Sequence, residues 1–144
     1  MPIEATTNPR APAPVVTQEI QIVDTDGHPR LVLSAKTGSP VIEMLQADGR
    51  ASFAVSLDAA GRPTMKLSNP DEAGPTATLE IVDSGTHVKF VRPGGGTSYL
   101  FLNNAGGSGV VLIDTKGVRR LVALAPADGT VRIERFDPDG KPLP

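Results

Sequence analysis

Few residues in this chain of 144 could perform acid–base or nucleophilic chemistry. There are two histidines and no cysteine, which excludes cysteine nucleophiles, thiolate metal ligands and disulfides. His28 lies within Asp26-Gly27-His28-Pro29, a sequence typical of an exposed turn. His87 alternates with Lys89, as on the polar face of a strand. Acid–base catalysis needs such a group held in a pocket, so we predict no catalytic residue and no enzyme activity.

Paired carboxylates are the residues best able to bind a metal ion. Asp24 and Asp26, like Asp137 and Asp139, place two carboxylates one residue apart, which a hard cation such as Ca²⁺ favours. Turn formation explains the same residues, and no complete calcium loop with a following Glu is present. We therefore predict no metal site and no cofactor.

Two glycine-rich segments share part of the pattern of a functional loop. Gly107-Ser108-Gly109 lacks the strand, turn and helix that surround a nucleophilic serine. Gly94-Gly95-Gly96 lacks the helix N-terminus that a phosphate cradle requires. Both segments are interpreted as loops.

Charge and hydropathy exclude several partners. The 14 basic and 16 acidic residues are interspersed and give a net charge of −2, so there is no basic face for nucleic acid or an anionic membrane. No run of 18 apolar residues could span a membrane, and residues 1–16 lack the pattern of a signal peptide. We expect synthesis in the cytoplasm and no membrane insertion.

The strongest pattern in the chain is a glycine at nearly regular intervals of 10 to 13 residues. Glycine tolerates positive φ, so this spacing predicts a series of tight reversals, as in an all-β meander. Four of these glycines follow Asp, and Pro29, Pro40, Pro63 and Pro142 each stand two residues after such a glycine, where a strand begins. The series is Gly27, Gly38, Gly49, Gly61, Gly74, Gly85, Gly95, Gly106, Gly117, Gly129 and Gly140.

Between the reversals, apolar residues alternate with polar ones, which places them on one face of a pleated strand. No stretch offers room for an ordinary helix apart from 15–26, which is rich in Val and Ile. The fold class is therefore all-β: an antiparallel β-meander of about ten to eleven short strands without helix, arranged as a repeat-built sandwich, a barrel or a β-prism.

Two strands break the alternation, because residues 99–102 and 110–113 are apolar on both faces. We expect them to be covered on both sides by a second sheet or another subunit. The chain has only five aromatic residues, too few for a typical ligand platform. The candidate assembly contacts are Phe90, Tyr99, Phe101, Leu102, Val111 and Leu112.

An internal repeat underlies the spacing. Residues 24–35 and 114–125 match at seven of twelve positions, and residues 58–69 share five residues with the first copy. The offsets of 34 and 90 residues correspond to three and eight strands. The expected domain organisation is a Pro-rich extended arm over 1–16, the β-repeat domain over 17–137 and a flexible tail over 138–144.

The form D-x-x-G-x-x-R-L-V-x-L occurs at Asp24/Gly27/Arg30/Leu31/Val32/Leu33 and, with the last Leu one place later, at Asp114/Gly117/Arg120/Leu121/Val122/Leu124. It resembles the β-hairpin repeat segments of phage tail-fibre and virion proteins and of some bacterial surface proteins. The resemblance implies a structural or adhesive component, in a virion or at a cell surface, that works as an oligomer and commonly as a trimer.

The leading hypothesis is a non-enzymatic structural protein that assembles with copies of itself, as a homotrimer, and with other virion or surface proteins. The alternative is a small β-sandwich or β-barrel that binds a ligand, a glycan or a protein partner. The low aromatic content favours the first hypothesis, since dry aliphatic contacts between strands do not need aromatic rings.

Overall fold

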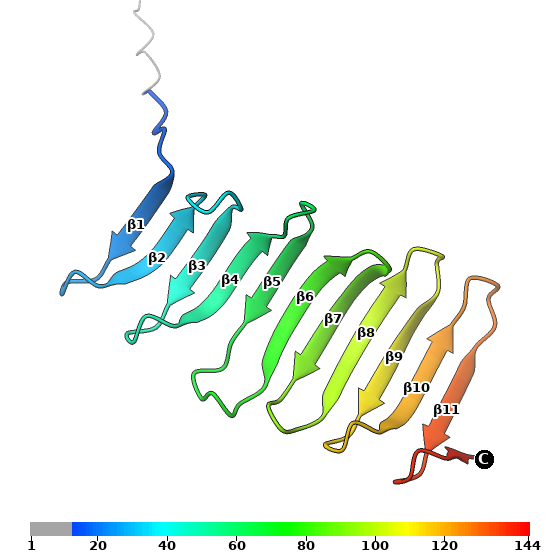
Figure 1. The fold of residues 1–144 in the computed structure, drawn as a ribbon. Helices are drawn as coiled ribbons and strands as arrows, with labels where there is room; N and C mark the ends of the chain where they lie inside the picture. The colour runs from blue at the N-terminus through cyan, green and yellow to red at the C-terminus, as the bar shows by residue number, and fades with distance from the viewer. Residues whose placement is uncertain (1–12) are drawn as a thin grey trace, which may run out of the picture.

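The computed structural model describes residues 13–144, which form one continuous antiparallel sheet (Figure 1). Each strand pairs with the next one along the chain. The predicted all-β meander without helix is confirmed for these residues, with twelve strands instead of ten or eleven. The strands are β1 (Glu19–Val23), β2 (Pro29–Ser34), β3 (Val41–Leu45), β4 (Ala51–Leu57), β5 (Pro63–Leu67), β6 (Thr76–Val82), β7 (Gly85–Val91), β8 (Thr97–Asn103), β9 (Ser108–Ile113), β10 (Arg119–Ala125), β11 (Arg132–Phe136) and β12 (Pro142–Leu143).

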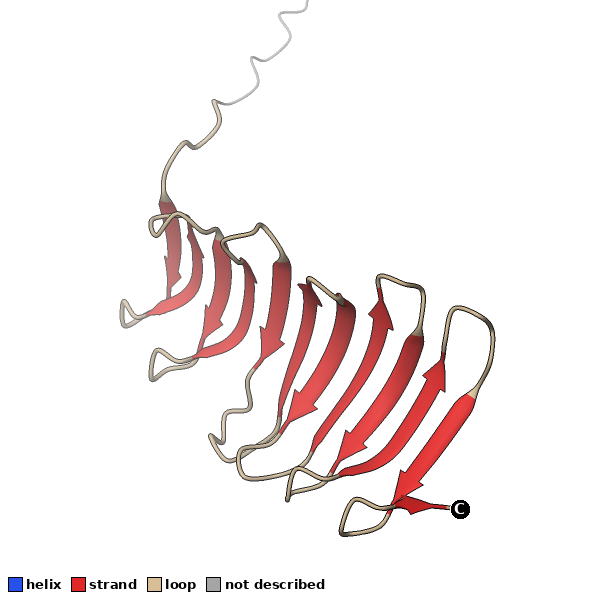
Figure 2. Cartoon of the chain, turned by 45° about the vertical axis from the view of Figure 1, so that its right-hand side comes forward, coloured by secondary structure: helices blue, strands red, loops and turns tan. Residues whose placement is uncertain are grey.

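The sheet is open and consists of a single layer. The strands β1 and β12 lie at its two ends, and strands contact only their neighbours in the sequence. No other element of the described chain lies over either face (Figure 2). Residues 13–144 therefore contain neither a closed barrel nor a two-sheet sandwich, and one chain leaves both faces of its sheet without a covering layer.

The hairpins form through the predicted glycine chemistry. In the β1–β2 turn, the Asp24 N–H donates to the His28 carbonyl at 2.9 Å, and the Gly27 N–H donates to the Asp24 carbonyl at 3.1 Å. Gly27 has a φ of 85°. A left-handed residue after a type I turn gives the three-residue hairpin loop whose twist matches that of the strands. The backbone bonds recur at Asp58/Gly61, Asp114/Gly117 and Asp137/Gly140.

The repeat predicted from the sequence is a structural repeat. Its three copies are the β1–β2, β4–β5 and β9–β10 hairpins, so the second and third copies lie three and eight strands after the first. Pro29, Pro63 and Pro142 begin strands, and Pro40 immediately precedes one. The spacing of the turns is thus the local signal that sets the strand boundaries.

Replacing Gly27 or Gly117 with Val should destabilise the fold by more than about 1 kcal/mol, because a β-branched side chain is strained at positive φ. The two φ values are 85° and 80°, and an added Cβ would meet no atom within 4 Å, so the cost is conformational and not steric. Denaturant unfolding measures the effect, and Lys116→Val in the same turn is the control. Equal stability of the Gly117→Val and Lys116→Val variants would contradict the prediction.

The ends of the chain relate to the sheet as follows. Residues 13–16 precede β1 and are exposed, while the rest of the expected arm, residues 1–12, lies outside the described residues. Residues 138–144, assigned from sequence to a flexible tail, contain the turn at Gly140 and the short strand β12. That strand pairs with β11 through Phe136 and Pro142, so the meander extends beyond residue 137.

Candidate functional site

Strand register places apolar side chains of successive strands on one face of the sheet, here called the apolar face. Directly paired residues share a face, and residues two apart on a strand share it as well. One row crosses eleven strands: Ile20, Leu33, Ile42, Val55, Met65, Leu79, Val88, Leu100, Val110, Ala123 and Ile133. The parallel row is Ile22, Leu31, Met44, Phe53, Leu67, Ala77, Phe90, Ser98, Leu112, Leu121 and Arg135.

These two rows are uncovered over their whole length. Met44 is 53% exposed, Phe90 51% and Leu100 56%, and most of the large apolar residues in the rows are more than a third exposed. Neither row contains a charged residue before Arg135 in β11. Large exposed apolar patches on soluble proteins mark interaction surfaces. The apolar face is therefore the principal candidate functional site.

The opposite face, here called the mixed face, differs along the sheet. It is polar in the first strands, where Glu43 and Lys66 lie on it, and partly apolar from β7 to β10. Val111 and Val122 pair with each other on this face and are 4% and 6% exposed, which makes them the buried hydrophobic residues of the described chain. The two-sided apolar character of 110–113 thus has a partial explanation within one chain.

The structure separates the six candidate assembly contacts into two groups. Phe90, Leu102 and Leu112 lie on the apolar face, and Phe90 and Leu102 are more than half exposed. Tyr99, Phe101 and Val111 lie on the mixed face. The rings of Tyr99 and Phe101 have centroids 6.0 Å apart, whereas Phe90 lies on the other side of the sheet.

Sequence reasoning missed the extent of the apolar face. Leu33, Ile42, Leu79 and Leu100 belong to it just as Phe90, Leu102 and Leu112 do. The signal was present in the alternation of every strand. It became a continuous surface only once the register showed that the strands β1 to β11 all present apolar residues on one shared side.

The histidines lie where the sequence predicts. His28 is in the β1–β2 turn with its side chain 66% exposed, and its Nδ1 lies 3.6 Å from Asp24 Oδ1. His87 is on the mixed face, where its Nε2 lies 2.8 Å from Glu80 Oε1. Lys89 Nζ lies 3.5 Å from the same oxygen atom. No described residue forms a nucleophile–base pair with either imidazole.

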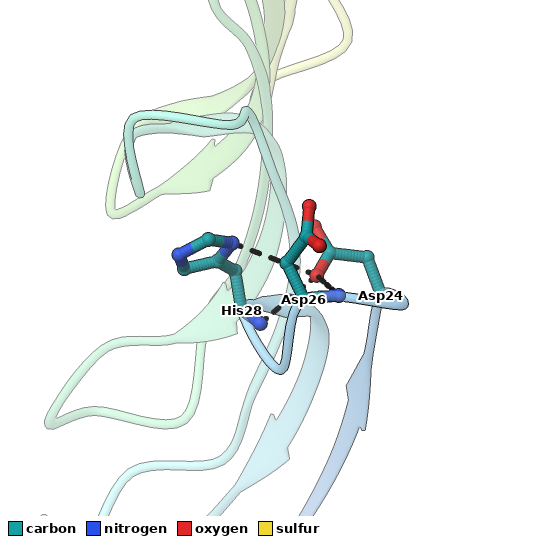
Figure 3. Close-up of side chains that lie close together, drawn as sticks. All are labelled: Asp24, Asp26 and His28. Atoms are coloured by element: carbon teal, nitrogen blue, oxygen red, sulfur yellow. Dashed lines mark hydrogen bonds and ion pairs between the residues drawn. The ribbon is translucent and has the colours of Figure 1, made fainter.

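Asp24, Asp26 and His28 are close enough together to hold a metal ion (Figure 3). However, Asp24 Oδ1 accepts the backbone N–H groups of Asp26 and His28, both at 3.0 Å. Asp114 forms the same two bonds in the β9–β10 turn without a nearby histidine. The turn therefore explains the arrangement of these side chains, and the sequence predicts the same turn for the Asp of each repeat copy.

These turn hydrogen bonds shift the ionisation of the aspartates. Donation from the backbone N–H of His28, Arg62 and Val118 lowers the pKa of Asp24, Asp58 and Asp114, respectively. A carboxyl group with a lower pKa in the folded state stabilises the fold at pH values above its unfolded pKa. That stabilisation is lost as the pH falls through the folded pKa.

The melting temperature should therefore fall as the pH drops below about 4. Thermal unfolding followed by circular dichroism between neutral pH and pH 2.5 measures the fall, and Asp24→Asn and Asp114→Asn should each make it shallower. Asp26→Asn is the control, because Asp26 contributes its backbone N–H to the turn and the substitution leaves that N–H in place. A melting temperature that rises on acidification would contradict the prediction.

Residues 13–144 include no helix with the length and apolarity needed to cross a lipid bilayer. Comparison with protein-family models gives no match. Comparison with curated proteins likewise finds no similar sequence. The geometry of the chain itself must therefore carry any functional conclusion.

Proposed function

We propose that this protein is a non-enzymatic structural module that assembles by burying its apolar face against other copies of itself. The observation that supports the proposal is the apolar face: two rows of side chains that cross eleven strands and are covered by nothing in the described chain. Antiparallel sheets are stable with one face packed and one face solvated. Here a neighbouring molecule has to supply the packing.

The exposed surface of the chain is too large for a compact monomer. It measures 10549 Å² for 15.0 kDa, whereas a compact monomer of that mass exposes about 7,000 Å². Even after roughly 1,900 Å², the most that twelve residues can expose, is subtracted for residues 1–12, the surface of the remaining chain is about 2,000 Å² larger than that of a compact monomer of its mass. A stable interface buries about 800 Å² on each partner, so the excess is sufficient for permanent association.

An identical chain is the partner that fits this surface best. The partner must be apolar over the length of eleven strands, and it must not bring charged groups against Leu79 or Val88 at the centre. A second copy presents the same rows at the same strand spacing, and rotational symmetry then buries every copy equally. In the two rows only Arg135, in β11 near one end of the sheet, is charged, and most other charged residues of each copy lie at the turns and on the mixed face, in water.

The repeat form at Asp24 and Asp114 adds support, because it resembles repeats of virion, tail-fibre and surface proteins. On that basis we propose a fibre, virion or cell-surface component that works as a homotrimer. Other proteins of the same particle or surface would be its further partners.

Native mass spectrometry and light scattering at micromolar concentration test the proposal. We expect a homo-oligomer, with a mass three times the 15.0 kDa of one chain for a trimer. A stable monomer of 15.0 kDa without self-association would contradict it. A dimeric mass would support the proposed self-assembly and contradict the proposed trimer.

A further inference from the structure

A depression of about 430 Å³ lies on the mixed face over β7 and β8. Its walls include His87, Lys89, Tyr99 and Phe101, and its rim reaches Asn103. Small-molecule sites are concave, have volumes of about 300–1,000 Å³, and combine apolar walls with a few polar groups. In the proposed assembly the mixed face points to solvent, so this inference rests on the proposed function for the accessibility of the depression.

Glycine makes room for the depression. Gly85 is one of its lining residues and has a φ of 149°, and an added Cβ would lie 2.2 Å from the Leu102 carbonyl oxygen. Across the sheet, Phe101 pairs with Gly109, and a Cβ on Gly109 would lie 2.9 Å from the Phe101 ring. The absence of a side chain at Gly109 lets the Phe101 ring lie low over the sheet, and the absence of one at Gly85 lets β7 and β8 approach each other beside the recess.

The polar groups of the depression are held in place by one carboxylate. Glu80 Oε1 contacts both His87 Nε2 and Lys89 Nζ, and the side chains of Glu80 and His87 are only 22% and 20% exposed. Because both contacts are with Oε1, the second carboxylate oxygen of Glu80, Oε2, remains available to accept a hydrogen bond. Asn103 uses its Oδ1 to accept the Gly107 N–H at 2.8 Å, so its amide N–H groups remain available as donors.

This set of groups selects the chemistry of the ligand. An anion is disfavoured because Glu80 already neutralises Lys89, and a nucleic-acid strand is disfavoured because the chain has a net charge of −2. A purely apolar molecule would leave the polar groups of Glu80 and Asn103 without partners. A neutral sugar ring satisfies both requirements, since its C–H face packs on an aromatic ring while its hydroxyl groups donate and accept hydrogen bonds.

We propose that the depression lined by His87, Lys89, Tyr99, Phe101 and Asn103, with the Glu80 carboxylate next to His87 and Lys89, binds a neutral saccharide. The ring packs against Tyr99 and Phe101. Neighbouring hydroxyl groups bond with the Glu80 carboxylate and with the Lys89 and Asn103 donors.

Tyr99 is an intrinsic fluorescence probe of this site, because it is the single tyrosine of the chain and there is no tryptophan. The full chain is titrated with the methyl glycosides of glucose, galactose and N-acetylglucosamine, and Tyr99 fluorescence is recorded. At least one sugar should give a saturable change. Phe101→Ala and Glu80→Gln should weaken its binding at least tenfold, while Phe136→Ala, an aromatic residue elsewhere in the sheet, should not.

Saturation-transfer NMR gives a second readout that does not depend on tyrosine fluorescence. If circular dichroism shows that the Phe101→Ala variant is unfolded, binding is measured with the Glu80→Gln and Tyr99→Ala variants instead. No saturable response to any neutral sugar, from a sample that light scattering shows to be assembled, overturns this proposal and leaves the proposed function standing. Tighter binding of N-acetylneuraminic acid than of every neutral sugar also overturns it.

Discussion

Leu102→Asp and Leu112→Asp are expected to convert the assembled protein into monomers or aggregates. Both side chains lie on the apolar face, where they are 54% and 42% exposed in a single chain. In an assembly they would be buried, and a carboxylate without a partner in such a site costs several kcal/mol. Association should weaken by at least about a hundredfold, which corresponds to roughly 2.7 kcal/mol.

Sedimentation or native mass measurement over a range of concentrations follows the dissociation. Thr78→Asp is the matched control, because it places the same carboxylate on the mixed face between its paired neighbours Lys66 and Lys89. This variant should assemble like the parent chain. Normal assembly of Leu102→Asp and Leu112→Asp would show that the apolar face is not the interface.

Gly85→Ala is expected to be the most destabilising small substitution, with a loss of about 3 kcal/mol or more. The backbone at Gly85 has a φ of 149°, and the new Cβ would lie 2.2 Å from the Leu102 carbonyl oxygen and 2.7 Å from Asn103 Cα. Both contacts are with backbone atoms of the paired strand β8, so relief requires the β7–β8 pairing to open. Conformational strain and steric overlap therefore act together.

Denaturant unfolding measures the loss, with Gly94→Ala as the comparison. Gly94 also has a positive φ, of 61°, but an added Cβ there meets no atom within 4 Å. Its substitution should cost only about 1 kcal/mol. Similar stabilities of the two variants would indicate that β7 and β8 do not approach each other as closely as the structure shows.

The local architecture was predictable because its determinants are local. Turns at Asp24-Gly27 and Asp114-Gly117 need only a carboxylate and a residue that tolerates positive φ, and both are visible in a few letters of sequence. Alternation such as Ile20/Ile22 and Val88/Phe90 determines which side chains share a face of a strand. These two patterns together determine an antiparallel meander and exclude helix.

The candidate site was predictable only in part. From the sequence, Phe90, Tyr99 and Phe101 stand together among the candidate assembly contacts. Cross-strand pairing places Phe90 opposite Ser98, and Lys89 opposite Tyr99, so the two aromatic groups lie on different faces. Face membership across strands depends on register, and a shift of one residue would reverse it.

The sequence by itself determined the strands, their turns and the alternation within each strand. Only the tertiary structure decided that the sheet stays open, that one face carries apolar rows from β1 to β11, and that His87, which contacts Glu80, lies with Tyr99 in the lining of one recess. The physical reason is the separation in sequence of the residues that determine each feature. Turn and strand formation depend on residues a few positions apart, whereas closure and the alignment of rows depend on register and twist accumulated over all twelve strands.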